Sequence, residues 1–242
     1  MPSPSPAFMP ATPLQEVDAV CGEAVSAWLT GLDYDWSELT RDARRRHVAR
    51  DEALFHEGER AATVYAVEQG RVRLSSFSAD GHERHLMILG PSGLVGDCGL
   101  LAHDSYVVSA FGAADTTVWA IPTERLLAAL ESRPALLRQH TELNARRMRI
   151  MLQHLALQGP QSGPRRVCHH LLGLLRGYGV RHAQGIVISI TFTQQEMGCI
   201  CGLSRVSVAQ VFAQLERDGI IGRIGRLVLV RDVRQLAARA LG

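Results

Sequence analysis

The side chains best suited to chemistry lie at the start of a predicted helix over Arg205–Arg217. Apolar residues recur there at helical spacing and predict a buried face of Val208, Val211, Phe212 and Leu215. The outward residues near the start of the helix are then Arg205, Val206, Ser207 and Gln210. Arginine can donate two parallel hydrogen bonds to a guanine edge, glutamine can pair with an adenine edge, and valine can contact a thymine methyl group. This set suits the reading of bases in a major groove.

A shorter predicted helix, Gln194–Cys201, must position the first one. Thr193 and Glu196 have the spacing of a capping box that opens this helix, and Gly202 ends it. Ser204 then caps the following helix. Two helices joined by a tight turn that contains glycine are typical of a helix-turn-helix. The helix N-termini, with Ser204, Thr193 and Gln195, suit contacts to phosphate.

The surroundings of these helices favour the same interpretation. Residues 220–230 alternate apolar and polar side chains around Gly225 and predict a small hairpin wing. Residues 164–242 hold 11 arginines against 4 acidic residues, whereas residues 1–163 hold 15 arginines against 20 acidic residues. A basic unit behind an acidic one is typical of a nucleic-acid-binding module joined to another domain. The alternative is a winged helix that contacts protein, with the same residues merely solvated.

The N-terminal part has a different pattern of apolar, polar and turn-forming residues. Residues 1–13 are rich in Pro and Ser, which predicts a disordered tail rather than a secretory signal, and residues 14–45 are predicted as helical turns. Between about 47 and 122, turn signals separate short alternating segments, and Asp80-Gly81 predicts a hairpin. The predicted strands are Val64–Val67, Val72–Phe77, His85–Leu89, Tyr106–Phe111 and Thr117–Ile121. We therefore expect an antiparallel β-roll.

A short helix, Thr123–Glu131, precedes a long one that begins at Pro134 and runs to about Gln158. Small or apolar residues recur along the long helix at alternating spacings of 4 and 3, which is a heptad seam. These residues are Leu137, Thr141, Asn144, Met148, Met151 and Leu155. Other apolar residues widen the surface, so one partner cannot cover it. We expect a parallel homodimer along this seam.

Together these patterns predict an α+β chain. Its expected parts are a tail (1–13), an antiparallel β-roll (14–132), a dimerisation helix (133–158) and a winged helix-turn-helix domain (164–242). Residues 159–164, with two glycines and two prolines, are the expected hinge. A further helix over Val167–Tyr178 and a strand over Ile186–Phe192 complete the C-terminal part.

The order of parts resembles the cyclic-AMP receptor protein / fumarate-nitrate reduction regulator (CRP/FNR) family over about residues 47–236. The most specific matching segments are TQQEMG at 193–198, LSRVSV at 203–208 and LERDGII at 215–221. Weaker matches are Gly58-Glu59, Tyr65, GRV at 70–72, GDCGLL at 96–101 and ARRM at 145–148. The resemblance implies a homodimeric transcription factor that binds a palindromic operator, with RNA polymerase as a further partner. It also implies that the β-roll (14–132) is cyclic-nucleotide-binding-like and senses an effector.

Departures from the family pattern concern the effector. Asp97 stands where the family has a Glu, and Val107-Val108 fill the positions of the Arg-Ser pair that clamps a cyclic phosphate. Met151 and Leu152 occupy the Thr-Ser positions that meet the base. A phosphate buried beside two valines would lack a cation. We expect no cyclic AMP binding. The expected effector pocket consists of Leu86, Val95, Gly96, Asp97, Leu100, Val107, Val108, Met148, Met151 and Leu152.

Other cofactors are weighed from the cysteines and histidines. Five scattered cysteines cannot supply an N-terminal iron–sulfur cluster, because only Cys21 lies in that region. Cys199 and Cys201 are two residues apart on a predicted helix and point to different faces, so we expect no metal there. Haem stays open, since any of several histidines could ligate iron, although none is fixed by motif spacing. These are His82, His85, His103, His140 and His154.

Several function classes are disfavoured by what the sequence lacks. We find no Gly-x-Ser-x-Gly, P-loop or His-Glu-x-x-His segment, so we do not expect an enzyme. No apolar run reaches the ~18 residues of a membrane span, and the scattered cysteines suit a reducing compartment. We expect a cytoplasmic protein without a membrane partner. A regulatory subunit that does not bind DNA is the remaining alternative.

Overall fold

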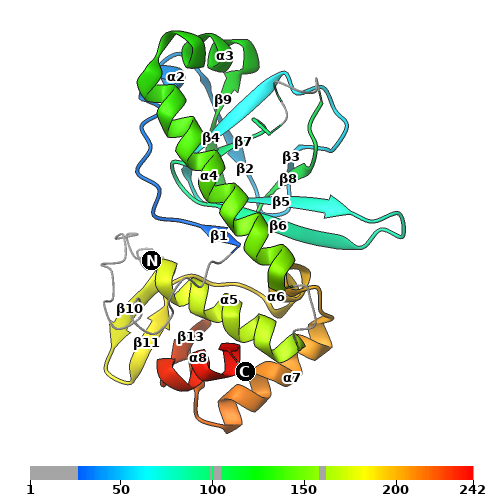
Figure 1. Cartoon of the computed structure of the whole chain (residues 1–242), viewed down its shortest axis with the longest axis vertical. Helices are drawn as coiled ribbons and strands as arrows, with labels where there is room; N and C mark the ends of the chain where they lie inside the picture. The colour runs from blue at the N-terminus through cyan, green and yellow to red at the C-terminus, as the bar shows by residue number, and fades with distance from the viewer. Residues whose placement is uncertain (1–26, 99, 101–104, 158–161, 242) are drawn as a thin grey trace, which may run out of the picture.

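The computed structural model describes residues 27–98, 100, 105–157 and 162–241. Two bodies lie along the long axis of the molecule: a sheet-rich body from the N-terminal part and a mixed body from the C-terminal part (Figure 1). The long helix α4 (Pro134–Leu157) runs along the first body toward the second. The expected tail at residues 1–13, Cys21 and His103 fall outside the described residues.

The N-terminal body is a roll of two sheets. One sheet has the order β1-β6-β5-β8-β3, and the other has the order β2-β9-β4-β7. The strands of the first sheet are β1 (Trp28–Leu29), β3 (Ala53–Phe55), β5 (Val72–Phe77), β6 (Glu83–Leu89) and β8 (Ser109–Gly112). Those of the second are β2 (Arg44–Val48), β4 (Thr63–Gln69), β7 (Leu94–Val95) and β9 (Thr116–Pro122). Except for the parallel pair β1–β6, the described strand pairs of the roll are antiparallel.

The β5–β6 hairpin forms where the sequence predicts it. The two strands pair from Val72–Leu89 to Phe77–Glu83, and Gly81 in the turn has a φ of +81°. A left-handed backbone at this position favours glycine. Apolar side chains of the strands meet inside the roll with Leu39, Val64, Leu94 and Ile121, which are all nearly fully buried. The roll therefore has its own core.

Two predictions for the roll are wrong. The helical expectation over 14–45 fails in its described part, which holds β1, the four-residue helix α2 (Ser37–Thr40) and the start of β2. The predicted strand Tyr106–Phe111 begins only at Ser109. Tyr106 instead stacks on Phe55 with ring centroids 3.7 Å apart, and its hydroxyl donates to the Thr63 carbonyl. Its backbone also pairs with a turn: the Tyr106 N–H donates to the Glu59 carbonyl, and the Tyr106 carbonyl accepts from the Gly58 N–H, so Tyr106 lies outside the pairing of β8 with β3 and β5.

Two helices follow the roll. Pro122 ends β9 and precedes α3 (Thr123–Ser132), and α4 then begins at Pro134 as predicted. One face of α4 packs against the roll core through Leu136, Leu143 and Ile150. Leu143 and Ile150 are thus part of the roll core, whereas the apolar side chains on the outer face of α4 are not covered by the roll.

The C-terminal body holds four helices around a four-stranded sheet. The helices are α5 (Gly163–Tyr178), α6 (Gln194–Cys201), α7 (Arg205–Arg217) and α8 (Val233–Leu241). The sheet has the order β10-β11-β13-β12, with β10 (Gly179–His182), β11 (Gly185–Ile188), β12 (Ile221–Ile224) and β13 (Leu227–Val230). Helix α5 begins inside the expected hinge, four residues before its predicted start, because Ser162 and Pro164 suit a helix N-terminus.

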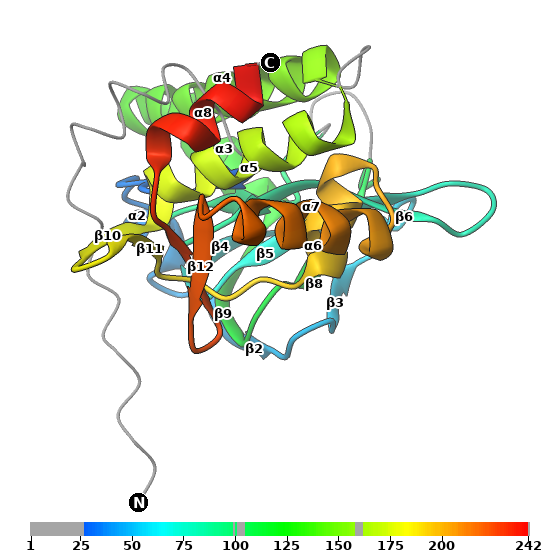
Figure 2. The same cartoon turned by 90° about the horizontal axis from the view of Figure 1, so that it is seen from below.

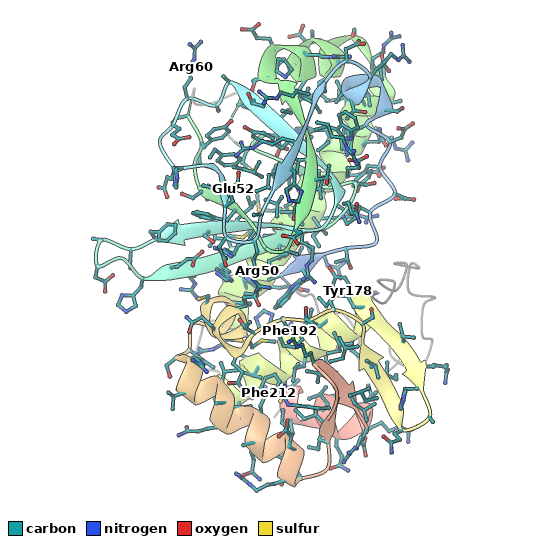
Figure 3. The ribbon with its side chains drawn as sticks, turned by 180° about the vertical axis from the view of Figure 1, so that it is seen from behind. Arg50, Glu52, Arg60, Tyr178, Phe192 and Phe212 are labelled. Atoms are coloured by element: carbon teal, nitrogen blue, oxygen red, sulfur yellow. The ribbon has the colours of Figure 1, made fainter. Side chains whose placement is uncertain are left out.

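The strand predicted over Ile186–Phe192 ends at Ile188. Ser189 still donates its backbone N–H and its hydroxyl to the Tyr178 carbonyl, which continues the β10–β11 register by one residue. The pairing stops there because Tyr178 is the last residue of α5. The chain then runs on toward Phe192, which packs against Trp28 and Phe212. Figure 3 shows Phe192 and Phe212 in this body, below Arg50 of the roll.

No single helix within the described ranges combines the length and apolar character needed to cross a membrane. Helices α6 and α7 would meet those criteria only as a pair, and they are bent by 108° at their junction.

Candidate nucleic-acid interface

The turn between α6 and α7 is built by the capping residues that the sequence predicts. The Thr193 hydroxyl accepts from the Glu196 backbone at 3.0 Å, and the Glu196 carboxylate accepts from the Thr193 backbone at 2.6 Å. Gly202 adopts the left-handed conformation with a φ of +63° and ends α6. Ser204 caps α7 by accepting from the Ser207 backbone at 3.0 Å. The two helices form the expected helix-turn-helix.

The start of α7 is open to solvent. Arg205, Val206 and Gln210 are exposed, and Val206 retains 66% of its accessible surface. On the opposite face, Val208, Phe212 and Leu215 are buried in the core of the C-terminal body, and Val211 packs at its edge. Exposed valine beside arginine and glutamine is consistent with a helix whose partner lies outside the chain. In Figure 2, α7 and the β12–β13 wing lie on the same side of the molecule.

A cleft of about 580 Å³ joins the candidate phosphate contacts to the wing. Its lining includes Thr193 and Gln195 at the start of α6, Arg205 on α7, and Arg223 and Arg226 from the wing. Arg223 is paired with Glu216 at 3.0 Å, whereas Arg226 has no ion pair within the described part of the chain. Arg223 and Arg226 are not among the contact residues predicted from the sequence. The hairpin pattern around Gly225 was the signal that could have found Arg226.

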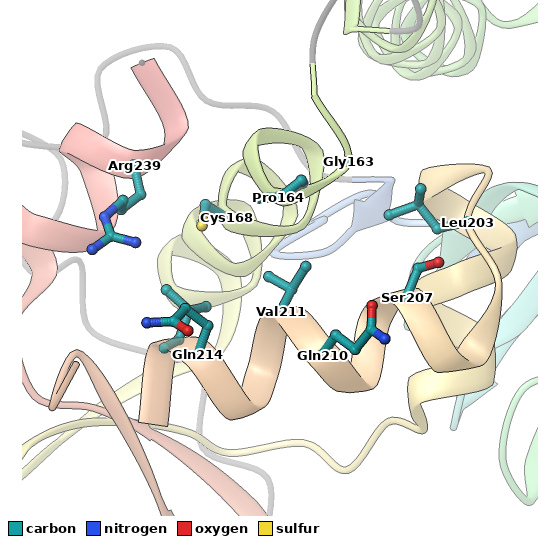
Figure 4. A pocket seen from close by; sticks show the side chains of 10 residues that line it. Gly163, Pro164, Cys168, Leu203, Ser207, Gln210, Val211, Gln214 and Arg239 are labelled. Carbon is teal, nitrogen blue, oxygen red and sulfur yellow. The ribbon is translucent and has the colours of Figure 1, made fainter. Parts of the chain in front are cut away.

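Ser207 and Gln210 face a second, mostly apolar groove of about 350 Å³ between α7, α5 and α8. Figure 4 shows Ser207, Gln210, Val211 and Gln214 along α7, across from Pro164 and Cys168. Ser207 is half-buried, and its hydroxyl lies 2.8 Å from that of Ser204. The predicted contact residues of α7 therefore lie on two sides of the helix: Arg205 lies toward the wing, and Ser207 and Gln210 lie toward α5.

Four of the six predicted seam residues, Leu137, Thr141, Met148 and Leu155, are exposed on the outer face of α4. Of the other two, Asn144 accepts a hydrogen bond from Arg147 and Met151 packs against the roll core. Leu137, Met148 and Leu155 retain 48%, 62% and 62% of their accessible surface, and Leu152 retains 59%. Thr141 is exposed, while Asn144 and Met151 are half-buried. An apolar stripe of this length on a solvent-facing helix is typical of an interface.

Asp97, expected in the effector pocket, is bound to α4. Its Oδ2 atom accepts from Arg147 Nη1 at 2.7 Å and lies 2.9 Å from His140 Nε2. Burial alone would raise the pKa of Asp97, but the positive charge of Arg147 and the His140 hydrogen bond lower it to about 2. Asp97 Oδ1 is also buried and has no hydrogen-bond partner within the described residues. This ion pair was not predicted from the sequence, because Arg147 on α4 lies 50 residues after Asp97 and no local spacing connects them.

The remaining residues of the expected effector pocket are dispersed. Val95 and Gly96 are buried, Leu86, Leu100, Val108 and Met151 are half-buried, and Val107, Met148 and Leu152 are exposed. A pocket of about 570 Å³ takes in Asp97 and Leu100 from this set. Its other lining comes from Cys98, Leu126, Leu127, Leu130, Glu131, Leu137, His140 and Asn144. The hollow beside Asp97 thus faces α3 and the first half of α4.

Comparisons with known proteins match both bodies. Residues 45–133 match the family model of the cyclic nucleotide-binding domain, and residues 165–239 match that of the Crp-like helix-turn-helix domain. The chain is 30% identical over 199 residues to the cyclic AMP receptor protein of Thermus thermophilus, with 82% of this chain and 89% of that protein covered. It is also 30% identical over 199 residues to the transcriptional activator protein Anr of Pseudomonas aeruginosa, with 82% and 81% covered.

A solved structure agrees with these matches. The structure of FixK2 from Bradyrhizobium japonicum superposes with a TM-score of 0.71 at 25% identity, and covers 81% of this chain and 96% of that one.

Proposed function

Because this chain belongs to the CRP/FNR family of transcriptional regulators, we propose that it recognises a palindromic DNA operator as a homodimer. Residues 14–132 act as the effector-sensing roll, 133–158 as the dimerisation helix and 164–242 as the DNA-binding domain. RNA polymerase is the further partner of the bound dimer.

The exposed start of α7 carries this proposal. Arg205 is placed to offer its guanidinium fork to a guanine, Gln210 to pair with an adenine, and Val206 to contact a thymine methyl group. The half-buried Ser207 contributes at the edge of the same surface. Thr193, Gln195 and Ser204 lie at the two helix N-termini, where backbone N–H groups and the helix dipoles favour phosphate. The basic wing extends the same surface.

Symmetry fixes the form of the operator. A twofold dimer places two copies of α7 in successive major grooves, so the half-site centres lie about 34 Å apart. Val206 and Gln210 replace the Glu and second Arg that are commoner in the family, and these types read different bases. Each half-site therefore keeps a guanine opposite Arg205 and differs elsewhere from the common family half-site.

Selection from a randomised DNA pool tests this assignment. Arg205→Ala is expected to cost about 1–3 kcal/mol and to relax the preference for one guanine in each half-site. Arg217→Ala is the matched control, because Arg217 is exposed on the last turn of the same helix and bonds Gln214. Unchanged base selectivity in the Arg205→Ala protein would contradict the role of Arg205. No selected site from wild-type protein would contradict DNA recognition itself.

The effector is not cyclic AMP in this proposal. Val107 and Val108 offer no cation to a cyclic phosphate, and Asp97 already pairs with Arg147. An apolar ligand with one hydrogen-bond donor suits the pocket beside Asp97, because Oδ1 is a buried acceptor. The ligand would act by a population shift in the packing of α4 and the spacing of the two copies of α7.

Three measurements test the effector proposal. Micromolar binding of cyclic AMP in calorimetry would contradict it. Mass spectrometry of small molecules retained by the purified protein would identify the ligand. A Soret band in the visible spectrum would instead support the haem alternative.

A further inference from the structure

Three metal-ligating side chains meet where the roll touches the helix-turn-helix. Glu83 and His85 come from β6, and Cys199 comes from α6, which packs against β6. One ligand atom from each residue lies within 4.8 Å of those of the other two. Alternate residues of a strand point to the same side, so Glu83 and His85 face α6 together. Cys201, the partner considered for Cys199 from the sequence, is instead buried in the core of the C-terminal body.

The imidazole at this point is buried and incompletely bonded. His85 retains 3% of its accessible surface, and its Nε2 atom lies 3.3 Å from Glu83 Oε1. Its Nδ1 atom has no hydrogen-bond partner within the described part of the chain. A buried polar nitrogen without a partner is costly. An ion bound to His85 Nδ1 would give this nitrogen the partner that it lacks.

The donor set and its surroundings suit a thiophilic divalent cation. An imidazole nitrogen, a thiolate and a carboxylate are three of the ligand types that bind zinc, and they leave a fourth tetrahedral position for water. Glu83 and Cys199 are only partly buried, so an ion can reach them from solvent.

Neighbouring charges do not exclude a cation. The Arg73 guanidinium lies 3.0 Å from Glu83 Oε1, but its Nη1 atom also donates to Asp51 at 2.6 Å, which balances its charge. Ser75 donates to the same oxygen of Glu83 at 2.7 Å. Glu83 Oε2 takes part in none of these contacts. The carboxylate and the thiolate together would balance the two charges of the ion.

We propose that Glu83, His85 and Cys199 form a binding site for a zinc-class divalent cation that clamps the helix-turn-helix to the roll. The clamp lies beside two other contacts between the same bodies: Arg50 pairs with Glu196 at 2.9 Å, and Arg71 donates to the Thr191 carbonyl at 3.3 Å. Bound metal would favour the relative position of α6 and β6 seen here, and so bias where α7 is held.

Titration of the full-length, reduced and metal-free protein with Co²⁺ tests the ligands. We expect one equivalent to bind with a thiolate-to-cobalt charge-transfer band, and Zn²⁺ to displace it. Cys199→Ser should abolish the band. His85→Gln should weaken binding by at least about tenfold, since even outer-shell changes cost about 10–100-fold. His82→Gln is the matched control, because His82 is exposed on the same hairpin and bonds Asp80.

Hydrogen exchange tests the clamp. Zn²⁺ should slow exchange together in Glu83–Leu89 and Gln194–Cys201 of the wild-type protein, and should have no such effect in Cys199→Ser. The site is contradicted if wild-type protein gives no charge-transfer band, or if Cys199→Ser keeps it. Protection confined to one of the two segments would contradict the clamp. Neither measurement uses DNA, so both stand apart from the test of operator recognition.

Discussion

At the scale of single residues, the two wing arginines differ in how much of their charge is available. Arg223 is held by Glu216, whereas Arg226 is exposed beside Gly225 and has no ion pair within the described part of the chain. An unpaired guanidinium at the end of a cleft that contains helix N-termini suits one phosphate contact. Arg226 should therefore add affinity without adding base preference.

Arg226→Ala is expected to weaken binding uniformly across operator sequences and to reduce the salt slope of log K by about 1. Fluorescence anisotropy with labelled operator at several salt concentrations measures both quantities. Arg60→Ala is the control, because Arg60 is exposed at the far end of the roll (Figure 3). An unchanged salt slope in Arg226→Ala would remove this residue from the interface.

At the scale of elements, the turn between β4 and β5 depends on one glycine. Gly70 has a φ of +83°, and a Cβ atom added there would lie 2.4 Å from the Asp115 carbonyl oxygen and 2.6 Å from Thr116 Cα. Both contacts are with backbone, which cannot rotate away. The Thr116 hydroxyl also accepts from the Arg71 backbone N–H and donates to the Arg71 carbonyl. These bonds hold the two segments close together.

Gly70→Ala is expected to lower the free energy of unfolding by at least about 2 kcal/mol more than Gly81→Ala. Gly81 has nearly the same φ, +81°, but a Cβ atom there meets nothing within 4 Å. Gly81→Ala should thus cost only about 1–2 kcal/mol for the left-handed backbone. Urea denaturation of both variants separates the steric effect from the conformational one. If both variants lose the same free energy of unfolding, the Asp115 backbone moves away from the new Cβ atom at no cost, which would contradict this prediction.

The elements that the sequence predicts well are those with local causes. The strand Val72–Phe77 and the helix Arg205–Arg217 have the predicted bounds, because alternation, a hairpin glycine and capping residues act within a few positions. The two-residue strand β1 is missed because it forms by parallel pairing with Ile88 and Leu89. Tyr106 is misassigned because Phe55 and Thr63, distant in sequence, hold it.

The same distinction applies to the sites. The exposed residues at the start of α7 follow from helical periodicity within one segment. The Asp97–Arg147 ion pair joins the roll to α4, and the Glu83–His85–Cys199 cluster joins β6 to α6. Neither has a local spacing that a single segment could reveal. Pairing across long sequence separation is what the folded structure adds.

At the scale of the whole molecule, the proposed dimer depends on the outer face of α4, which would bring two copies of α7 together. Met148 and Leu155 lie seven residues apart on this face, and both are exposed in the single chain. The buried face of α4 already serves the roll through Leu143 and Ile150. A change on the outer face should therefore disturb assembly while each chain stays folded.

Met148→Glu with Leu155→Glu is expected to give a folded monomer in sedimentation. Operator affinity should fall by about 10²–10⁴-fold, because each half-site then binds independently. Arg138→Gln is the control, since Arg138 is exposed on α4 but pairs with Glu142 rather than lying in the stripe. A wild-type protein that sediments as a monomer at operator-binding concentrations would contradict the proposed assembly.

Two buried histidines lie where α4 meets the C-terminal body. The rings of His154 on α4 and His170 on α5 are 5.0 Å apart. His154 Nε2 and His170 Nδ1 have no hydrogen-bond partner among the described residues. Burial lowers the pKa of His154 to about 4, with smaller effects from His169 and Arg84, and burial also holds the pKa of His170 well below 6.5. Both rings are therefore neutral at pH 7. Protonation of either ring would place an unpaired charge in the buried contact between α4 and α5, which is costly.

The sign of the resulting pH dependence follows from proton uptake. The ordinary pKa of histidine is about 6.5, so between pH 6.5 and about 4 the unfolded chain binds a proton that folded His154 does not. The free energy of unfolding should be fully retained above pH 6.5, and His154 alone should lower it by on the order of 3 kcal/mol as the pH drops to about 4. His170 shifts the stability in the same direction. Urea denaturation at pH 7.5, 6 and 5 measures this loss before most carboxylates titrate. His154→Gln should flatten the slope, and His182→Gln, an exposed histidine, should not. A wild-type stability that stays level from pH 7.5 to 5 would mean that the rings accept protons in the folded junction.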